Sequence, residues 1–201
     1  MTGLRQRKRQ QVHEAISAAA IALFLERGFD EVSVAEVAAA AGISKPTLFK
    51  YFATKEDLVL HRISDHQGEA ALVVRRRDEG ETPLAALRRH FLAGLERRDP
   101  VTGLNDHREV LAYHRMIFSV PGLAARLLHH MAVDEEALAE ALAETVDELT
   151  ARLVAGQVLA VQRVLARGNW ARLAEGETAD QVYPAAVAAA RRAFDLLPRL
   201  G

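Results

Sequence analysis

Hydroxyl and lysine side chains gather on a short segment between residues 44 and 50, at spacings that suit contact with DNA. If this segment is helical, Lys45, Thr47 and Lys50 are free to point outward, while Leu48 and Phe52 share an apolar side. Lysine ammonium groups bind phosphate oxygens, and hydroxyl groups reach both phosphates and base edges. The pattern therefore predicts a recognition helix with an apolar back and a polar front.

The residues around this segment supply a stronger signal, because a single exposed lysine is typical of any solvated helix. Three successive helix starts share one pattern. In each, an apolar residue comes directly before a hydroxyl residue that can cap the helix, and a second apolar residue follows five positions after the first: Val32-Ser33…Val37, Ile43-Ser44…Leu48 and Ala53-Thr54…Leu58. Ser33 and Glu36 have the spacing of a capping box, and Pro46 lies in a first turn, where its missing N–H costs nothing. Gly42 lies where the chain must reverse. These features predict a helix-turn-helix at residues 33–52.

The remaining pattern predicts longer helices and no strands. Apolar residues recur at helical spacing, alanine is abundant, and glycine and proline fall between the periodic segments. We expect an all-α fold of about nine helices, with a three-helix helix-turn-helix domain at 1–53 and a helical bundle at 54–201. A turn region is predicted from Gly168 to Gly176, around Trp170. The predicted helices outside the motif cover 7–27, 55–78, a segment from Thr82-Pro83 through Leu95, 106–119, 121–145, 147–168 and 178–196.

Charge is distributed unevenly although the formal net charge is only −1. Arg5, Arg7, Lys8 and Arg9 precede the first acidic residue, Glu14, and every lysine lies within the first 55 residues. A local basic face at one end of a nearly neutral protein is the expected footprint of a DNA-binding domain. The alternative interpretation of such a run is a solvated basic tail.

Several classes of site are disfavoured by what the sequence lacks. The chain contains no cysteine, which excludes disulfides and thiolate metal sites. His107 and His114 are seven residues apart, or about 10.5 Å along a helix, which is too far for one zinc ion. No nucleophile motif or phosphate-binding glycine loop occurs. We therefore expect no enzyme activity, no cofactor and no metal.

Nothing in the sequence suggests export or membrane insertion. No run approaches the roughly 20 apolar residues of a membrane span, and the N-terminus has no apolar signal core. The expected location is the cytoplasm.

The motif region resembles the TetR family of transcriptional regulators. The resemblance rests on the segments Gly42-Ile43-Ser44-Lys45-Pro46-Thr47-Leu48-Phe49-Lys50-Tyr51-Phe52 and Ala53-Thr54-Lys55-Glu56-Asp57-Leu58. The helix end at Ala20–Gly28, followed by Phe29 and then Val32-Ser33-Val34, also fits. The resemblance covers residues 10–60, and the later helices match the family in length and helix count.

This resemblance implies roles for individual residues at the DNA surface. Tyr51 would contact one phosphate, Lys55 and the start of the next helix would contact another, and Ser33 would act similarly at the preceding helix. The basic stretch Arg5–Arg9 would reach the backbone or the minor groove. Phe49 and Phe52 are expected in the core. The residues expected in the groove are Ser44, Lys45, Pro46, Thr47 and Lys50.

The family resemblance also implies an effector pocket between the fourth and seventh predicted helices. Each candidate residue alone is equally well read as part of an ordinary bundle core. Together they would form an apolar lining with a few polar groups, which suits an apolar or amphipathic ligand. The candidates are Phe91, Leu95, Leu111, His114, Arg115, Phe118 and Met131.

The last two predicted helices would form a homodimer interface by the same resemblance. One is rich in alanine (Ala185, Ala186, Ala188, Ala189, Ala190 and Ala193), and the other carries Leu149, Leu153, Gly156 and Val164. Small residues allow close helix approach, although packing within one chain would use them equally well. In a dimer, two recognition helices about 34–36 Å apart would read one turn of DNA.

The combined prediction is a dimeric, sequence-specific regulator, most simply a repressor that a small ligand releases from its operator. An enzyme that uses the helical cavity is the first alternative, and the absence of a nucleophile argues against it. A non-specific, chromatin-like DNA binder is the second, and the nearly neutral net charge argues against it.

Overall fold

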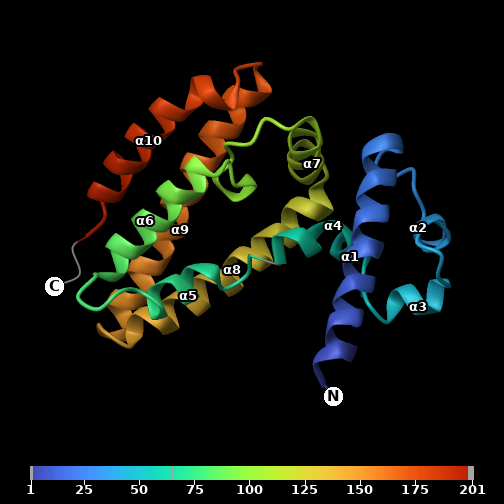
Figure 1. Ribbon diagram of the computed structural model, residues 1–201, viewed down its shortest axis with the longest axis horizontal. Coiled ribbons are helices and arrows are strands. Elements are labelled where there is room, and N and C mark those ends of the chain that lie inside the picture. Colours follow the sequence, from blue (N-terminus) through green and yellow to red (C-terminus); the bar gives the residue numbers. More distant parts are fainter. Residues whose placement is uncertain (1, 65, 199–201) are drawn as a thin grey trace. The chain divides into compact units, whose positions relative to one another are not determined.

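The computed structural model describes residues 2–64 and 66–198, with side chains at residues 7–63 and 66–198. All regular structure in these ranges is helical, in ten α-helices and one 3-10 turn (Figure 1). This confirms the predicted all-α class. The elements are α1 (Thr2–Arg27), α2 (Val34–Ala40), α3 (Lys45–Phe49), α4 (Lys55–Ser64), α5 (Glu69–Arg75), α6 (Pro83–Glu96), η1 (Pro100–Thr102), α7 (Arg108–Ser119), α8 (Pro121–Ala143), α9 (Glu148–Ala174) and α10 (Ala179–Asp195).

The chain forms two compact units, each built from two stretches of sequence. The first comprises Met1–His66 and Ala112–His130, and the second comprises Gln67–Leu111 and Met131–Gly201. The unit that contains the helix-turn-helix therefore also includes α4, most of α7 and the first turns of α8. The functional division after residue 53 stays a prediction.

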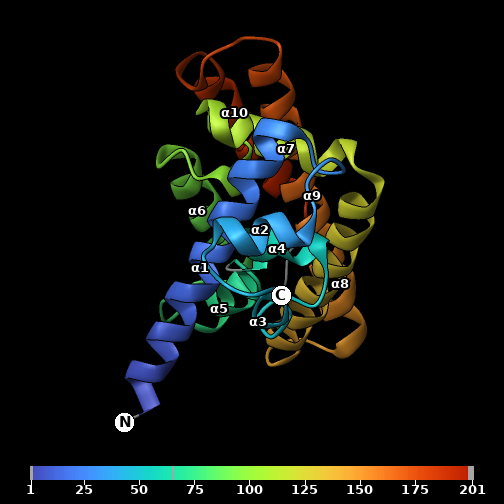
Figure 2. The same cartoon turned by 90° about the vertical axis from the view of Figure 1, so that its right-hand side faces the viewer.

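The first unit is organised around α1, which packs against both α2 and α4. Its core includes Phe24 of α1, Val37 of α2, Leu48 of α3 and Leu58 of α4, all less than 3% exposed. The N-terminal turns of α1 extend beyond the cluster of short helices (Figure 2). These four helices each bury one apolar side in a common core, so their opposite sides are left for solvent or ligands.

The fourth predicted helix is in fact two helices, so there are ten rather than nine. α4 ends at Ser64 and α5 begins at Glu69, after Gly68 adopts a left-handed conformation with φ of 75°. The Gly68 N–H donates to Asp134 Oδ1 at 2.8 Å instead of continuing a helix. Residues 64–69 carry no apolar side chain and include Gly68, so the local sequence marks this break and the predicted helix over 55–78 ran across it.

The second unit is a bundle in which α10 packs against α6 and α9 (Figure 1). Phe91 of α6 and Phe194 of α10 bring their ring centroids to 6.0 Å, and Leu95 and Val182 are fully buried nearby in the same core. Thr82 caps α6 and Pro83 follows in its first turn, as predicted.

The predicted turn from Gly168 to Gly176 is wrong over most of its length, because α9 continues to Ala174. Buried Asn169 donates through Nδ2 to the carbonyl of Thr102 in η1 at 2.9 Å, and Leu173 is 3% exposed. These tertiary contacts hold Gly168 in a helix, although glycine disfavours helix by about 1 kcal/mol. The next helix begins with a capping box of Thr178 and Gln181, at the predicted start of that helix.

α9 is long and apolar enough, by length and composition alone, to cross a membrane. This differs from the expectation that no segment approaches such a length. The core helix of a bundle satisfies the same test, and α9 packs along α10 and η1. Only 22% of its most apolar stretch is buried within this chain, which leaves an apolar surface to be explained.

Candidate nucleic-acid interface

The start of α2 is held by the predicted capping box. The Ser33 side chain accepts from the Glu36 N–H at 3.3 Å, and the Glu36 carboxylate accepts from the N–H and the hydroxyl of Ser33 at 2.8 Å each. Arg27 of α1 pairs with the other carboxylate oxygen at 2.8 Å. The hydrogen bonds from Ser33, followed by those from Arg27, lower the pKa of Glu36 to about 2. Ser33 is thus an exposed residue in a fixed geometry at a helix start.

The turn between α2 and α3 is closed by the backbone. Gly42 has φ of 67°, a left-handed conformation that costs glycine little, and its N–H donates to the carbonyl of Ala39 at 3.0 Å. The N–H of Ile43 donates to the carbonyl of Ala38 at 2.9 Å. The predicted tight turn of the helix-turn-helix is therefore confirmed.

α3 spans five residues and presents the predicted polar side. The Ser44 hydroxyl caps it by accepting from the Thr47 N–H at 3.2 Å, and it also lies 2.8 Å from the Thr47 hydroxyl. After Phe49 the chain continues as a tight turn, in which the N–H groups of Tyr51 and Phe52 both donate to the carbonyl of Leu48. The predicted groove residues lie along this segment: Ser44, Lys45, Pro46 and Lys50 are exposed, and Thr47 is half-buried.

The two phenylalanines of the motif have opposite environments. Phe52 is 2% exposed and packs in the core, as predicted. Phe49 is 46% exposed, so its predicted place in the core is wrong. Leu48 already fills the buried side of this five-residue helix, and the next residue is rotated by about 100° away from it. Phe49 thus adds an apolar group to the side that carries Lys45 and Lys50.

Tyr51 is held by a residue that sequence reasoning did not select. His13 of α1 places its Nε2 3.1 Å from the carbonyl oxygen of Tyr51 and its Nδ1 3.1 Å from Nε2 of His61. The His13 ring also lies against the ring of Phe52, with 4.0 Å between centroids. A histidine whose partners lie 38 and 48 residues away leaves no local signal in the sequence, so only the fold reveals this tie.

Lys55 lies at the start of α4, but its ammonium has an internal partner. Nζ donates to the backbone carbonyl of Phe29, and it lies 4.5 Å from the ring centroid of Phe29 and 5.4 Å from that of Phe24. The side chain therefore joins the loop after α1 to the beginning of α4. Its predicted phosphate contact would require the ammonium to leave this site.

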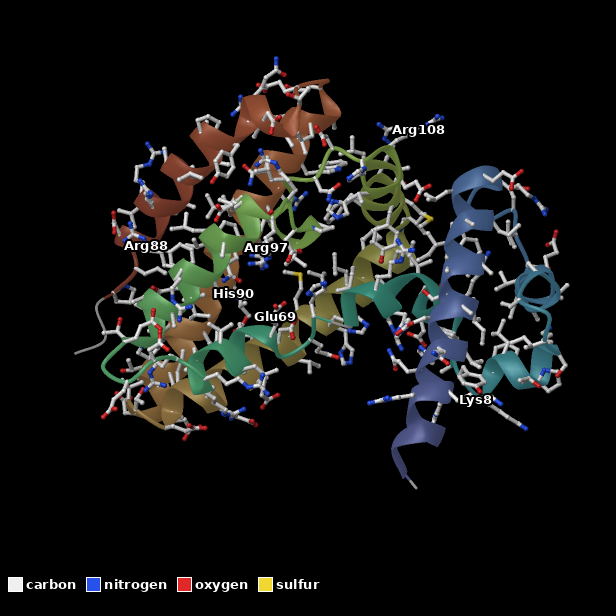
Figure 3. All side chains as sticks on the ribbon, viewed as in Figure 1. Lys8, Glu69, Arg88, His90, Arg97 and Arg108 are labelled. Atoms are coloured by element: carbon white, nitrogen blue, oxygen red, sulfur yellow. The ribbon has the colours of Figure 1, made fainter. Side chains whose placement is uncertain are left out.

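The basic N-terminal stretch is part of a helix instead of a free tail. α1 begins at Thr2, and the side chains of Arg7, Lys8 and Arg9 are exposed along its first turns. Figure 3 shows Lys8 projecting from this part of the helix. The side chain of Arg5 lies outside the described residues.

Comparisons with known proteins agree with this geometry. The family model for bacterial regulatory proteins of the TetR family matches residues 16–61, which span the C-terminal part of α1, the helix-turn-helix and most of α4. The chain is 34% identical to the transcriptional regulator TcmR of Streptomyces glaucescens over 173 residues, which is 82% of this chain and 76% of TcmR. The chain belongs to the TetR family.

Solved structures of TetR-family proteins share the fold over nearly the whole length. NalD of Pseudomonas aeruginosa, the secondary repressor of the MexAB-OprM multidrug efflux pump, superimposes with a TM-score of 0.61 at 17% identity, covering 92% of this chain and 97% of NalD. A TetR-family regulator of Mesorhizobium loti gives 0.56 at 17% identity, covering 95% and 98%. The protein is thus a TetR-family DNA-binding transcriptional regulator and not an enzyme.

The residues predicted for an effector pocket of this TetR-family chain are divided between the two units. Phe91 and Leu95 pack in the core of the second unit, and Leu111 lies partly buried against that core. Met131 is half-buried in the same unit. The other three belong to the first unit: Arg115 and Phe118 are exposed, and His114 is half-buried, with its pKa lowered by burial.

A polar contact that the sequence did not suggest lies in the second unit. His90 of α6 and Glu69 of α5 approach to 3.2 Å, and Figure 3 labels both where the two helices face each other. Their side chains are 34% and 39% exposed, so both groups remain accessible to a ligand.

Proposed function

We propose that this TetR-family regulator is a dimeric repressor, which a small apolar or amphipathic molecule releases from its operator. The proposal rests on the α3 segment. The start of this segment is capped, and the segment presents lysine, hydroxyl and aromatic groups on one exposed side. Such a side supplies both phosphate contacts and base contacts. The NalD protein, which shares the fold, is a repressor, and this supports repression here as well.

The proposed DNA surface places the exposed residues of α3 in the major groove and the flanking groups on phosphates. Lys45, Thr47 and Lys50 would donate to base edges or phosphates, while Phe49 would offer an apolar contact such as a thymine methyl accepts. Pro46 narrows which bases can be approached, because its ring is larger than the side chain of glycine or alanine and it has no N–H to donate. Contacts to the DNA backbone are proposed for Ser33 and Ser44 at their helix starts and for Tyr51 through its hydroxyl.

We propose a homodimer formed through α9 and α10. Leu149, Leu153 and Val164 are 68%, 55% and 67% exposed, and their spacing places them on one side of α9. On α10, Ala185 and Ala188 are exposed and Ala189 is half-buried, which permits close helix approach. A partner molecule would cover this apolar surface and form a four-helix arrangement. The same surface accounts for the low burial of α9 within one chain.

The effector proposal concerns the residues around α6, α7 and the beginning of α8. Burial lowers the pKa of the half-buried His114, which favours its neutral form. Phe118 is 39% exposed and offers an apolar surface beside it. Arg115 completes the part of the proposed set that belongs to the first unit, and the part in the second unit consists of Phe91, Leu95, Leu111 and Met131. These groups suit a ligand with an apolar body and few polar atoms, acting in the cytoplasm.

DNA titration tests the proposed recognition. The DNA upstream of the protein's own gene is footprinted first, and the protected segment is then compared with a random duplex of equal length. Thr47→Val and Lys50→Met should each reduce the preference for the protected segment, because a good base contact is worth about 1–3 kcal/mol. Arg76→Met, on an exposed arginine after α5, is the matched control and should leave the preference unchanged. Unaltered preference in both α3 variants would exclude this side of α3 as the reading surface.

Ligand release is tested separately, with a panel of neutral, cationic and anionic amphiphiles screened by thermal shift. Each compound that stabilises the protein is then added to a DNA titration, where coupling typical of allostery would weaken DNA binding about 5- to 150-fold. Phe118→Trp and Leu111→Trp enlarge two side chains of the proposed set and should weaken both effects. If neither variant alters binding or release, the effector binds elsewhere.

A further inference from the structure

The first turn of α4 is closed by a reciprocal pair of hydrogen bonds. Thr54 Oγ1 accepts from the Asp57 N–H at 3.1 Å, and Asp57 Oδ2 accepts from the Thr54 N–H at 3.1 Å. Only Ala53 separates this turn from Phe52, the last residue of the helix-turn-helix. Any group that holds the Asp57 carboxylate therefore also holds the chain as it leaves the recognition segment.

Arg126 of α8 holds the second oxygen of that carboxylate. Its Nε lies 3.0 Å and its Nη2 2.8 Å from Asp57 Oδ1. The two oxygens of Asp57 thus have different partners, one in its own turn and one on α8. The Asp57 side chain is only 20% exposed, against 43% for Arg126. Charge-assisted hydrogen bonds of this kind are stronger than neutral ones, and the two donors of the planar guanidinium fix its orientation.

Neighbouring residues of α8 support the same contact. A Cβ at Gly122 would lie 3.5 Å from Oε1 of Glu56, and Leu123 is fully buried in the core that includes Leu58. Gly122, Leu123 and Arg126 follow at a spacing that shares one side of a helix. The beginning of α8 therefore packs against the first turn of α4. α8 continues to Ala143, and its residues from Met131 onward belong to the second unit.

Two other ties act further along α4. The Ser17 hydroxyl of α1 donates to the carbonyl of Leu58 at 2.8 Å, and the Tyr113 hydroxyl of α7 donates to the carbonyl of Val59 at 2.8 Å. Both are buried and hold the middle of the helix. Arg126 acts on the side chain of Asp57, the residue before Leu58, in the turn that adjoins the recognition segment.

We propose that Arg126 is a positioning residue for operator binding. It acts through Asp57, fixing the first turn of α4 and with it the end of the helix-turn-helix. In this role it touches no DNA, so its loss changes the geometry of the reading segment without removing a phosphate contact. Because Arg126 lies near the beginning of α8, a displacement of this part of α8 would disturb DNA binding through the same pair.

The test is a double-mutant cycle of Arg126→Gln, Asp57→Asn and the double variant, titrated with the footprinted segment at several salt concentrations. The amide oxygen introduced by Asp57→Asn would still accept from the Thr54 N–H, so this substitution removes mainly the pairing with Arg126. We expect Arg126→Gln to bind about fivefold more weakly, a size typical of residues coupled by direct contact. The double variant should bind no more weakly than the weaker of the two single variants, and the salt dependence should stay as in the wild type.

Arg75→Gln is the matched control, since Arg75 of α5 pairs on the surface with Glu144 at 2.9 Å and should not affect DNA binding. Thermal unfolding is measured in parallel and should change little, because the arginine of the pair is 43% exposed and ion pairs at the surface contribute little to folding. If Arg126→Gln does not fold, Arg126→Lys replaces it in the same double-mutant cycle.

Additive losses of affinity, with a salt slope lower by about one unit, would show that Arg126 contacts phosphate directly. Unchanged affinity for Arg126→Gln would show that the pair has no role in DNA binding. Either result overturns the proposal.

Discussion

The ammonium of Lys55 donates to the backbone carbonyl of Phe29 and lies over the rings of both Phe29 and Phe24, 4.5 Å and 5.4 Å from their centroids. The family resemblance implies a phosphate contact for this lysine. In the structure its charge instead satisfies a loop carbonyl and lies over two aromatic faces, an arrangement worth about 0.5–2 kcal/mol for the cation–π part alone. The lysine therefore joins the end of α1 to the start of α4.

Replacing Lys55 distinguishes the internal tie from a phosphate contact. We expect Lys55→Met to lower the thermal stability and to leave the salt dependence of DNA binding unchanged, because no phosphate contact is lost. Lys50→Met is the matched control: this exposed lysine of the recognition segment should lower the salt slope by about one unit without affecting stability. A lower slope and unaltered stability for Lys55→Met would instead support the phosphate contact.

The two phenylalanines of the motif should separate stability from DNA binding. Phe52→Ala leaves a cavity in the core and should destabilise the protein by about 3–5 kcal/mol, as measured by denaturant unfolding. Phe49→Ala removes a half-exposed ring and should affect unfolding little but weaken binding to the footprinted segment. The hypothesis fails if Phe49→Ala binds that segment as tightly as the wild type.

The apolar side of α9 should be needed for dimerisation. Leu153→Arg leaves an isolated chain nearly unaffected, since Leu153 is 55% exposed there, but in the proposed dimer it would bury an unpaired charge. Sedimentation should show monomers for this variant and for Ala189→Arg. Leu72→Arg, at a 46%-exposed leucine of α5, is the control and should remain dimeric. An intact Leu153→Arg dimer would place the interface elsewhere.

The capping box at α2 should make stability depend on pH in the acid range. The pKa of Glu36 is lowered from 4.5 to about 2 in the folded state, so its charge stabilises the protein above about pH 4.5. This stabilisation is lost as the pH falls through the folded value. Glu36→Gln retains a capping partner without the charge.

Thermal unfolding of the wild type and of Glu36→Gln between about pH 7 and pH 2 checks this expectation. The wild type should be the more stable protein at neutral pH, and the difference should shrink below about pH 4.5. Glu79→Gln, an exposed carboxylate in the loop after α5, serves as the control. A difference that is constant over the whole range would rule out the charge of Glu36 as its cause.

The sequence alone determined the elements whose signals are local. Capping boxes at Ser33 and Thr178, the cap and proline at the start of α3, and the reversal at Gly42 all depend on residues within a few positions of one another. For the same reason the helix-turn-helix, its polar side and the family could be read from residues 33–58. A short segment favours the same local hydrogen bonds and backbone conformations in any fold that contains it.

Tertiary structure decided the features that depend on distant partners. Lys55 turns inward because Phe29 offers a carbonyl, and α9 continues past Gly168 because Asn169 reaches Thr102. Likewise, the beginning of α8 joins the DNA-binding unit through Arg126 and Asp57, which are 69 residues apart. Periodicity reports which side of a helix is apolar, but it does not report what covers that side. The free energy of these contacts arises only when the chain has brought their partners together.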